Sequence, residues 1–167
     1  MKACAFTGHR PEKLPFGADE ENPKCKLLKQ KLFCETLRMT RRGVTTFLTG
    51  MARGTDMWAA ETVLQLREVF PHGKIQLWAI VPYVKQAVSW NEADQKRYYH
   101  LLSSADRIVH VSEHYTRGCM HKRNRYLVDY ADCLIAVYNG QGGGTEYTIS
   151  YARKMGREVI VINPQDD

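Results

Sequence analysis

Short apolar runs alternate along the chain with amphipathic segments. Six runs rich in β-branched residues have the length and composition of strands, namely 3–7, 44–49, 75–81, 107–111, 134–138 and 158–162. Five segments between them repeat apolar residues every three or four positions, as one face of a helix does, namely 24–41, 56–70, 92–105, 119–131 and 145–155. The pattern therefore predicts strand and helix in regular alternation.

Alternation of this kind is typical of parallel sheets, because a helix usually forms the crossover between two parallel strands. The run Leu134–Val137 is apolar at every position, which indicates a strand buried on both faces. Residues 11–23 contain three prolines and four acidic residues, so we expect a surface loop there rather than a domain boundary. We therefore expect a single domain over residues 1–167, a doubly wound α/β fold with a mainly parallel sheet of about six strands and helices on both faces.

Composition excludes several classes of protein. The chain has 167 residues, of which 44% are hydrophobic and 25% charged, so disorder, a collagen-like chain and a disulfide scaffold are excluded. The longest strongly apolar run, Leu77–Val81, is too short to cross a membrane, and the first residues lack a signal-peptide pattern. Five cysteines without a CxxC pair favour reduced thiols in the cytoplasm. Cys119 and His121 lack two further zinc ligands, so no metal is expected.

The formal net charge of +6 favours an anionic partner, such as a nucleotide or a nucleic acid. Positive charge is concentrated in residues 24–42, where seven lysines and arginines accompany one acidic residue, Glu35, and again in residues 117–125. A basic helix is usually a solvated face, and the 24–42 stretch has only Phe33 to stack on bases. Binding of nucleic acid is therefore our second choice of partner.

The loops after the strands hold the candidate chemistry, because ligands of doubly wound folds bind where the strands end. The first such loop is Thr7-Gly8-His9-Arg10. Glycine allows close backbone approach, and the guanidinium of Arg10 suits a phosphate or a carboxylate. The alternative is an ordinary turn in which the side chains of His9 and Arg10 are solvated.

The loop after the second strand leads directly into a predicted helix. It contains Gly50, Arg53, Gly54 and Asp56, and the free N–H groups at the start of that helix attract an anion. Asp56 either accepts hydrogen bonds from a ribose or simply interacts favourably with the helix dipole. The spacing matches neither a Walker loop nor the GxGxxG fingerprint.

The loop after the fifth strand is the richest in glycine. Gly142, Gly143 and Gly144 stand immediately before Thr145, at the start of a predicted helix. Such a run is costly in chain entropy, and directly before a helix it presents a nest of N–H groups to a phosphate. We therefore expect a ligand role for Gly142–Thr145.

Three further residues are candidates on weaker grounds. Asn124 falls three residues before Leu127 on the buried stripe of its helix, so its amide needs a partner, either a neighbouring loop or a ligand. Arg125 belongs to the same basic cluster. Trp90 follows the third predicted strand and either stacks on a base or closes the core.

These motifs resemble a known family. Thr49–Asp56 resembles the SGxAxGxD element of DNA-processing protein A, and Arg123–Arg125 and Gly143–Thr145 continue that resemblance in the same order. Thr7–Pro11 together with Trp58–Glu61 is more specific and resembles the YpsA-like family, a bacterial and phage group of the SLOG superfamily. The resemblance covers nearly the whole chain and implies a Rossmann-like fold with a nucleotide or ADP-ribose-type ligand at the glycine-rich loops.

The resemblance implies three alternative functions. The first is a nucleotide-binding protein that senses or sequesters a phosphorylated nucleoside, with no cofactor required. The second is a nucleotide N-glycosidase related to the LOG phosphoribohydrolases, and the third is a single-stranded DNA-binding protein. Whether the chain forms a homo-oligomer stays open.

One departure from the family pattern favours binding over catalysis. The LOG hydrolases carry a glutamate three residues after the threonine of a PGGxGTxxE element, and Thr148 holds that position here. Glu146 points about 200° away from position 148 on a helix. Glu146 and Glu61 are then the only weak candidates for a catalytic acid.

Overall fold

The computed structural model describes residues 2–167. Within them, six strands alternate with five α-helices. The strands are β1 (Lys2–Gly8), β2 (Val44–Thr49), β3 (Gln76–Val81), β4 (Arg107–His110), β5 (Cys133–Val137) and β6 (Glu158–Ile162). The helices are α1 (Pro23–Arg41), α2 (Thr55–Val69), α3 (Glu92–Ser104), α4 (Cys119–Asp129) and α5 (Gly144–Lys154). The predicted alternation is confirmed, with boundaries displaced by only one or two residues.

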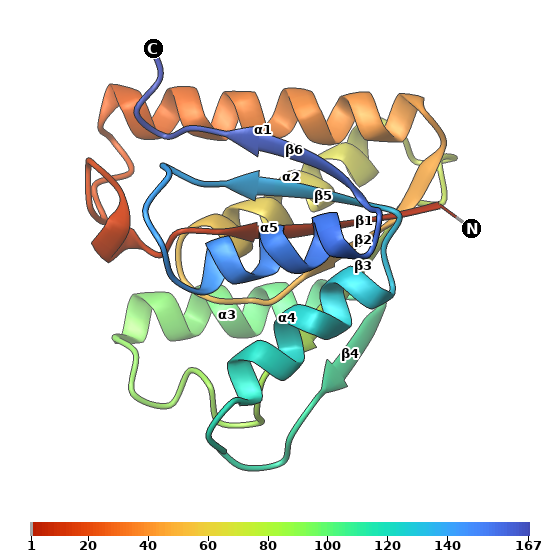
Figure 1. The fold of residues 1–167 in the computed structure, drawn as a ribbon. Helices are drawn as coiled ribbons and strands as arrows, with labels where there is room; N and C mark the ends of the chain where they lie inside the picture. The colour runs from red at the N-terminus through yellow and green to blue at the C-terminus, as the bar shows by residue number, and fades with distance from the viewer. Residues whose placement is uncertain (1) are drawn as a thin grey trace.

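All six strands form one sheet in the order β4-β3-β2-β1-β5-β6, and every neighbouring pair is parallel (Figure 1). From β1 the chain builds the sheet outward to β4, and it then returns to pair β5 with the free side of β1. The strand order therefore reverses between β1 and β5, which is the topological switch point where doubly wound folds hold their ligands.

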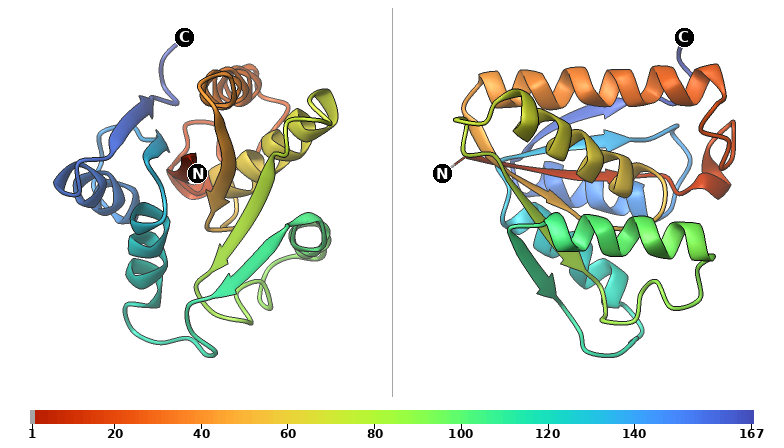
Figure 2. Two further views of the ribbon diagram at one scale, coloured as in Figure 1. Left: turned by 90° about the vertical axis from the view of Figure 1, so that its right-hand side faces the viewer. Right: turned by 180° about the vertical axis from the view of Figure 1, so that it is seen from behind.

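Helices cover both faces of the sheet, as the sequence predicted. Helices α1, α2 and α3 pack on one face, and α4 and α5 pack on the other (Figure 2). Right-handed crossovers require this division, because strands added on opposite sides of β1 place their helices on opposite faces.

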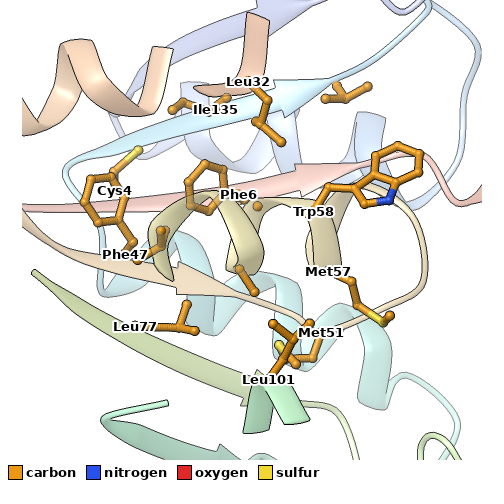
Figure 3. Packing of buried hydrophobic residues seen from close by; sticks show 14 of the residues in the cluster. Cys4, Phe6, Leu32, Phe47, Met51, Met57, Trp58, Leu77, Leu101 and Ile135 are labelled. Atoms are coloured by element: carbon orange, nitrogen blue, oxygen red, sulfur yellow. The ribbon is translucent and has the colours of Figure 1, made fainter. Parts of the chain in front are cut away.

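The larger core lies beneath α1, α2 and α3. Phe6 of β1 and Phe47 of β2 stack there with ring centroids 5.9 Å apart. Leu32 of α1 and Leu77 of β3 are also buried in this core (Figure 3). Burial of apolar side chains on both faces of the central strands explains why these strands read as continuous apolar runs.

The segment 11–23 is more than the surface loop that its composition predicted. It begins with a short 3-10 turn, Pro11–Lys13, and its side chains Leu14 and Phe16 are buried. The ring of Phe16 lies 6.2 Å from that of Trp58, centroid to centroid. The segment is therefore a surface loop, as expected, but two apolar side chains among many polar ones anchor it to the core.

A group of charged side chains fastens the end of this loop to α2 and α3. Arg97 of α3 donates hydrogen bonds to both Glu20 and Glu61, and Lys29 donates to Glu20. Burial acts to raise the pKa of Glu20, but the hydrogen bonds from Arg97 and Lys29 outweigh burial and lower this pKa from its ordinary value of 4.5 to about 2.

This shift predicts a pH dependence of stability. The pKa of Glu20 is lower in the folded state than in the unfolded state. The ionised Glu20 side chain therefore contributes fully to the free energy of unfolding above about pH 4.5, and this contribution is lost as the pH falls toward 2. We expect Glu20→Gln to lower the free energy of unfolding by about 1–2 kcal/mol at pH 7, after allowance for solvent screening. In urea unfolding at pH 2.5 the difference from the unsubstituted protein should largely vanish, and an equal difference at both pH values would contradict the assignment.

No helix within residues 2–167 has both the length and the apolar character needed to cross a membrane.

Candidate functional site

A cleft of about 290 Å³ opens at the carboxyl ends of β1 and β5, at the switch point of the sheet. We call it the switch-point cleft. Its lining comes from the loop after β1, the loop before α2, the inner face of α4 and the first turn of α5. The residues are Thr7, Gly8, His9, Arg10, Glu12, Lys13, Ala52, Asp56, Met120, Arg123, Asn124, Leu127, Gly144 and Thr145.

Arg123 is the buried cation of this cleft, with 4% of its surface exposed. Its Nε donates to Asn124 Oδ1 at 2.8 Å, and its Nη1 donates to the carbonyl of Gly50. A Cβ on Gly50 would lie 2.7 Å from the guanidinium carbon of Arg123, so this position admits only glycine while the arginine stays in place. The two neutral acceptors hold the guanidinium rigidly beside the cleft.

Asp56 faces the same cleft from the first turn of α2. Its side chain is buried and accepts a hydrogen bond from the amide of Ala52 at 3.2 Å. Burial raises the pKa of Asp56, and the charge of Arg123 partly offsets that rise. Burial likewise lowers the pKa of Arg123, and Asp56 opposes the change. Each group therefore favours the charged form of the other inside a largely desolvated site.

His9 is buried and lines the switch-point cleft, so the alternative of an ordinary turn with a solvated His9 side chain is wrong. Its Nε2 lies 2.8 Å from Asn139 Oδ1 in the loop after β5, and its carbonyl accepts from the hydroxyl of Thr55 at 3.0 Å. Burial lowers the pKa of His9, which favours the neutral imidazole. His9 thus connects three of the strand-end loops.

Gly8 permits this convergence of loops. A Cβ on Gly8 would lie 2.6 Å from the Cβ of Thr55, at the start of α2. The close approach that the sequence suggested for Gly8 therefore brings helix α2, with its free N–H groups, against the end of β1.

The glycine-rich loop enters the cleft only at its last residues. Gly144 and Thr145, the first two residues of α5, line the cleft. Gly142 lies at the rim, where its carbonyl accepts from Lys13 Nζ at 2.9 Å. Gly143 has a φ of +133°, a conformation that L side chains rarely adopt. The loop thus turns sharply into α5, and the first two residues of this helix, whose N–H groups have no partner within the helix, line the cleft.

A second cleft, of about 350 Å³, adjoins the first, and we call it the side cleft. The two clefts share Arg10 and Met120. The remaining lining residues are Arg53, Tyr83, Gln86, Ser89, Trp90 and Asn91. Trp90 packs edge-on against Tyr98, with ring centroids 5.2 Å apart, and the guanidinium of Arg53 lies 5.8 Å from the Trp90 ring centroid.

The structure thus brings most of the predicted ligand residues together and places a few elsewhere. Gly50 and Gly54 do not line either cleft but contact residues that do. The Gly50 carbonyl accepts a hydrogen bond from Arg123, and Gly54 packs against the carbonyl of His9. Arg125 is on the outer side of α4, where its Nη1 donates to the Tyr147 hydroxyl at 3.1 Å. Neither proposed catalytic acid lines a cleft: Glu61 is bound by Arg97, and Glu146 is exposed.

Thr148 occupies the position of the LOG glutamate. Its side chain is buried, and its hydroxyl donates to the carbonyl of Gly144 at 2.8 Å. Within the described chain, the carboxylates that line the switch-point cleft are Glu12 and Asp56. No group of three metal-ligating side chains occurs within residues 2–167.

Sequence reasoning missed Arg123, Lys13 and Met120. A signal for Arg123 was present, because it stands four residues before Leu127 and so shares the buried face of α4. The predicted Arg125 is two residues further on and therefore projects from the opposite side of the helix. Met120 gave a similar signal, because it stands seven residues before Leu127 on that face of α4, whereas Lys13 gave none, since only the folded loop after β1 brings it to the cleft.

The strand order, the helices on both faces and the polar cleft at the switch point define a Rossmann-like α/β protein. Within that class the chain belongs to the YspA SLOG family, whose sequence profile, named YpsA, matches residues 4–163. The resemblance to YpsA-like proteins of the SLOG superfamily is thereby confirmed.

Two relatives illustrate the family. The chain is 29% identical over 174 residues to a UPF0398 protein of Halalkalibacterium halodurans, and the alignment covers 99% of this chain and 90% of the relative. It is 32% identical over 160 residues to the SPbeta prophage-derived protein YoqJ of Bacillus subtilis, covering 86% of this chain and 92% of YoqJ.

Solved structures share the fold at low sequence identity. DNA processing protein A from Streptococcus pneumoniae superposes with a TM-score of 0.63 at 15% identity, over 96% of this chain and 50% of that one. The Helicobacter pylori protein, studied for its single-stranded DNA binding mode, gives 0.62 at 15% identity, over 96% of this chain and 64% of that one. TM1055 superposes with a TM-score of 0.57 at 17% identity, over 95% of this chain and 72% of that one. The present chain thus corresponds to only part of DNA processing protein A.

Proposed function

We propose that the switch-point cleft binds a phosphorylated nucleoside and that the protein senses or sequesters this ligand. The observation that carries the proposal is Arg123, a buried guanidinium held by neutral acceptors beside the first turn of α5. A buried cation with free N–H groups opposite it is suited to a phosphate, which both would stabilise. Asp56 and Asn124 supply the acceptor and donor groups that a ribose needs.

Binding should raise thermal stability. A ligand present at a hundredfold excess over its Kd stabilises the folded state by about 2.7 kcal/mol. For a chain of this size that corresponds to a rise in Tm of about 5–10 °C. We expect such a rise in differential scanning fluorimetry with at least one member of a panel of nucleoside mono- and diphosphates and ADP-ribose. A flat response across the whole panel would contradict the proposal.

Hydrolysis of an N-glycosidic bond is the second candidate, and Asp56 is the observation that favours it. A buried carboxyl with a raised pKa inside the cleft has the character of a general acid. The binding proposal expects nucleoside monophosphates to come back unchanged after hours with micromolar protein. Free base seen by chromatography, absent with Asp56→Asn, would establish the hydrolase instead.

Binding of single-stranded DNA is the third candidate, and the pattern of ion pairs favours a surface other than the basic stretch 24–42 for it. Most cations of residues 24–42 are paired with carboxylates, as in Lys24–Asp167, Lys26–Glu21, Lys29–Glu20, Arg38–Glu35 and Arg42–Glu158. Arg117, Lys122 and Arg125 instead surround an open hollow beside Tyr147, which favours that surface over α1. The association constant for single-stranded DNA at this surface would fall steeply with salt concentration, by about 0.7 log units per neutralised phosphate for each tenfold increase in salt.

A further inference from the structure

The side cleft has a chemistry of its own. Arg10 and Arg53 both line it, together with Ser89, Tyr83 and Asn91. Asn91 is the N-cap of α3, whose first turn carries Glu92 and Asp94, so the positive charge of the side cleft comes from its two arginines rather than from the helix end. Among the described residues that line it there is no carboxylate. These features suit a negatively charged group.

Both arginines are positioned to bind a ligand in the side cleft. Arg53 is held in position, because its Nη2 donates to Glu12 at 2.7 Å and its guanidinium lies over the ring of Trp90. Arg10 lies between the clefts, with its Nη2 4.0 Å from the sulfur of Met120, and it forms no ion pair within residues 2–167. The same sulfur is 4.0 Å from Nη2 of Arg123. Two guanidinium groups therefore approach one weak acceptor at the junction of the clefts.

The junction of the two clefts suits an anion that contacts both Arg10 and Arg123. A thioether sulfur is a poor partner for a guanidinium, whereas a phosphoryl oxygen is a strong one. Taken together, the two clefts present the cations Arg10, Lys13, Arg53 and Arg123 against the carboxylates Glu12 and Asp56. The surplus of two positive charges is divided between the clefts, because Lys13 and Arg123 line only the switch-point cleft, Arg53 lines only the side cleft, and Arg10 lines both.

We infer that the ligand carries a second anionic group, which lies in the side cleft and binds Arg10 and Arg53. The ligand is then a nucleoside diphosphate, or a nucleotide whose diphosphate is extended by a further group, rather than a simple monophosphate. This inference rests on the proposed function, since the first phosphate and the nucleoside occupy the switch-point cleft. Arg53 becomes the residue that distinguishes diphosphates from monophosphates.

Calorimetric titration of AMP, ADP and ADP-ribose into the protein and its variants tests this inference. We expect the unsubstituted protein to bind ADP or ADP-ribose at least tenfold more tightly than AMP. In Arg53→Gln that preference should fall to about twofold, whereas affinity for AMP changes by less than twofold. Arg125→Gln removes the same charge from the outer side of α4 and should preserve the preference, which separates local contact from general attraction.

The outcomes distinguish this inference from the function on which it rests. If AMP binds as tightly as the diphosphates, or if Arg53→Gln weakens all three ligands equally, the side cleft does not take a second anionic group, and the proposed function stands. If none of the three ligands binds at millimolar concentration, the proposed function fails and the inference fails with it.

Discussion

Replacing Arg123 by glutamine is expected to lower nucleotide affinity at least a hundredfold. The guanidinium is buried and held by Gly50 and Asn124, so it needs no reorganisation to meet a phosphate. Removing one partner of a buried, hydrogen-bonded charge pair typically costs 2–5 kcal/mol, and about 2.7 kcal/mol corresponds to a hundredfold change in Kd. Calorimetric titration with whichever nucleotide gives the largest thermal shift measures the effect.

Arg125→Gln is the matched control for that experiment. It removes the same charge from the same helix two residues away, on the side that faces Tyr147 and solvent. Affinity in this variant should stay within twofold of the unsubstituted protein. Equal losses in both variants would indicate long-range attraction rather than a site, and full affinity in Arg123→Gln would place the ligand elsewhere. Circular dichroism of both variants verifies that they are folded.

The second large effect is expected for Gly54→Ala, which should lower the free energy of unfolding by about 3 kcal/mol. Gly54 has a φ of +83°, and a Cβ there would lie 3.0 Å from Pro11 Cδ and 3.1 Å from the carbonyl oxygen of His9. The substitution therefore combines backbone strain with crowding between the loops after β1 and β2. Because these loops line the switch-point cleft, nucleotide affinity should fall as well. Urea unfolding measures the stability change.

Gly140→Ala separates the two causes. Gly140 has a similar φ of +87°, but a Cβ there would have no heavy atom within 4 Å. This variant should lose only about 1 kcal/mol, the ordinary cost of a left-handed alanine. Similar losses in the two variants would show that the loops after β1 and β2 do not press against each other at Gly54.

The fold was predictable from the sequence because its signals are local. Five of the six strands, all except β4, contain residues that the helices bury, so each appears as a short apolar run, and each crossover appears as a helical period. The loops of the candidate site were also predictable, because the glycines that allow a sharp turn into α2 and α5 are visible in the sequence directly before each helix. Strand boundaries such as Gln76 and Cys133 were displaced by one residue.

The parts that could not be predicted depend on contacts between distant segments. Burial of His9 requires Asn139 from the loop after β5, and the position of Lys13 requires the carbonyl of Gly142. Pairing of the cations in residues 24–42 uses carboxylates such as Glu20 and Glu158, which adjacent residues do not reveal. The choice between Arg123 and Arg125 is an exception, because Arg123 stands four residues before the buried Leu127 and therefore had a local signal that Arg125 lacked.

The central claim is that the switch-point cleft holds a phosphorylated nucleoside through Arg123. The most direct measurement is mass spectrometry of small molecules released from the unsubstituted protein and from Arg123→Gln, purified in parallel from the same cells. We expect a nucleoside phosphate to be released by the unsubstituted protein and to be absent, or at least tenfold depleted, in Arg123→Gln. The same nucleotide released in equal amounts by both proteins, or none released by either together with no thermal shift across the panel, would contradict the claim.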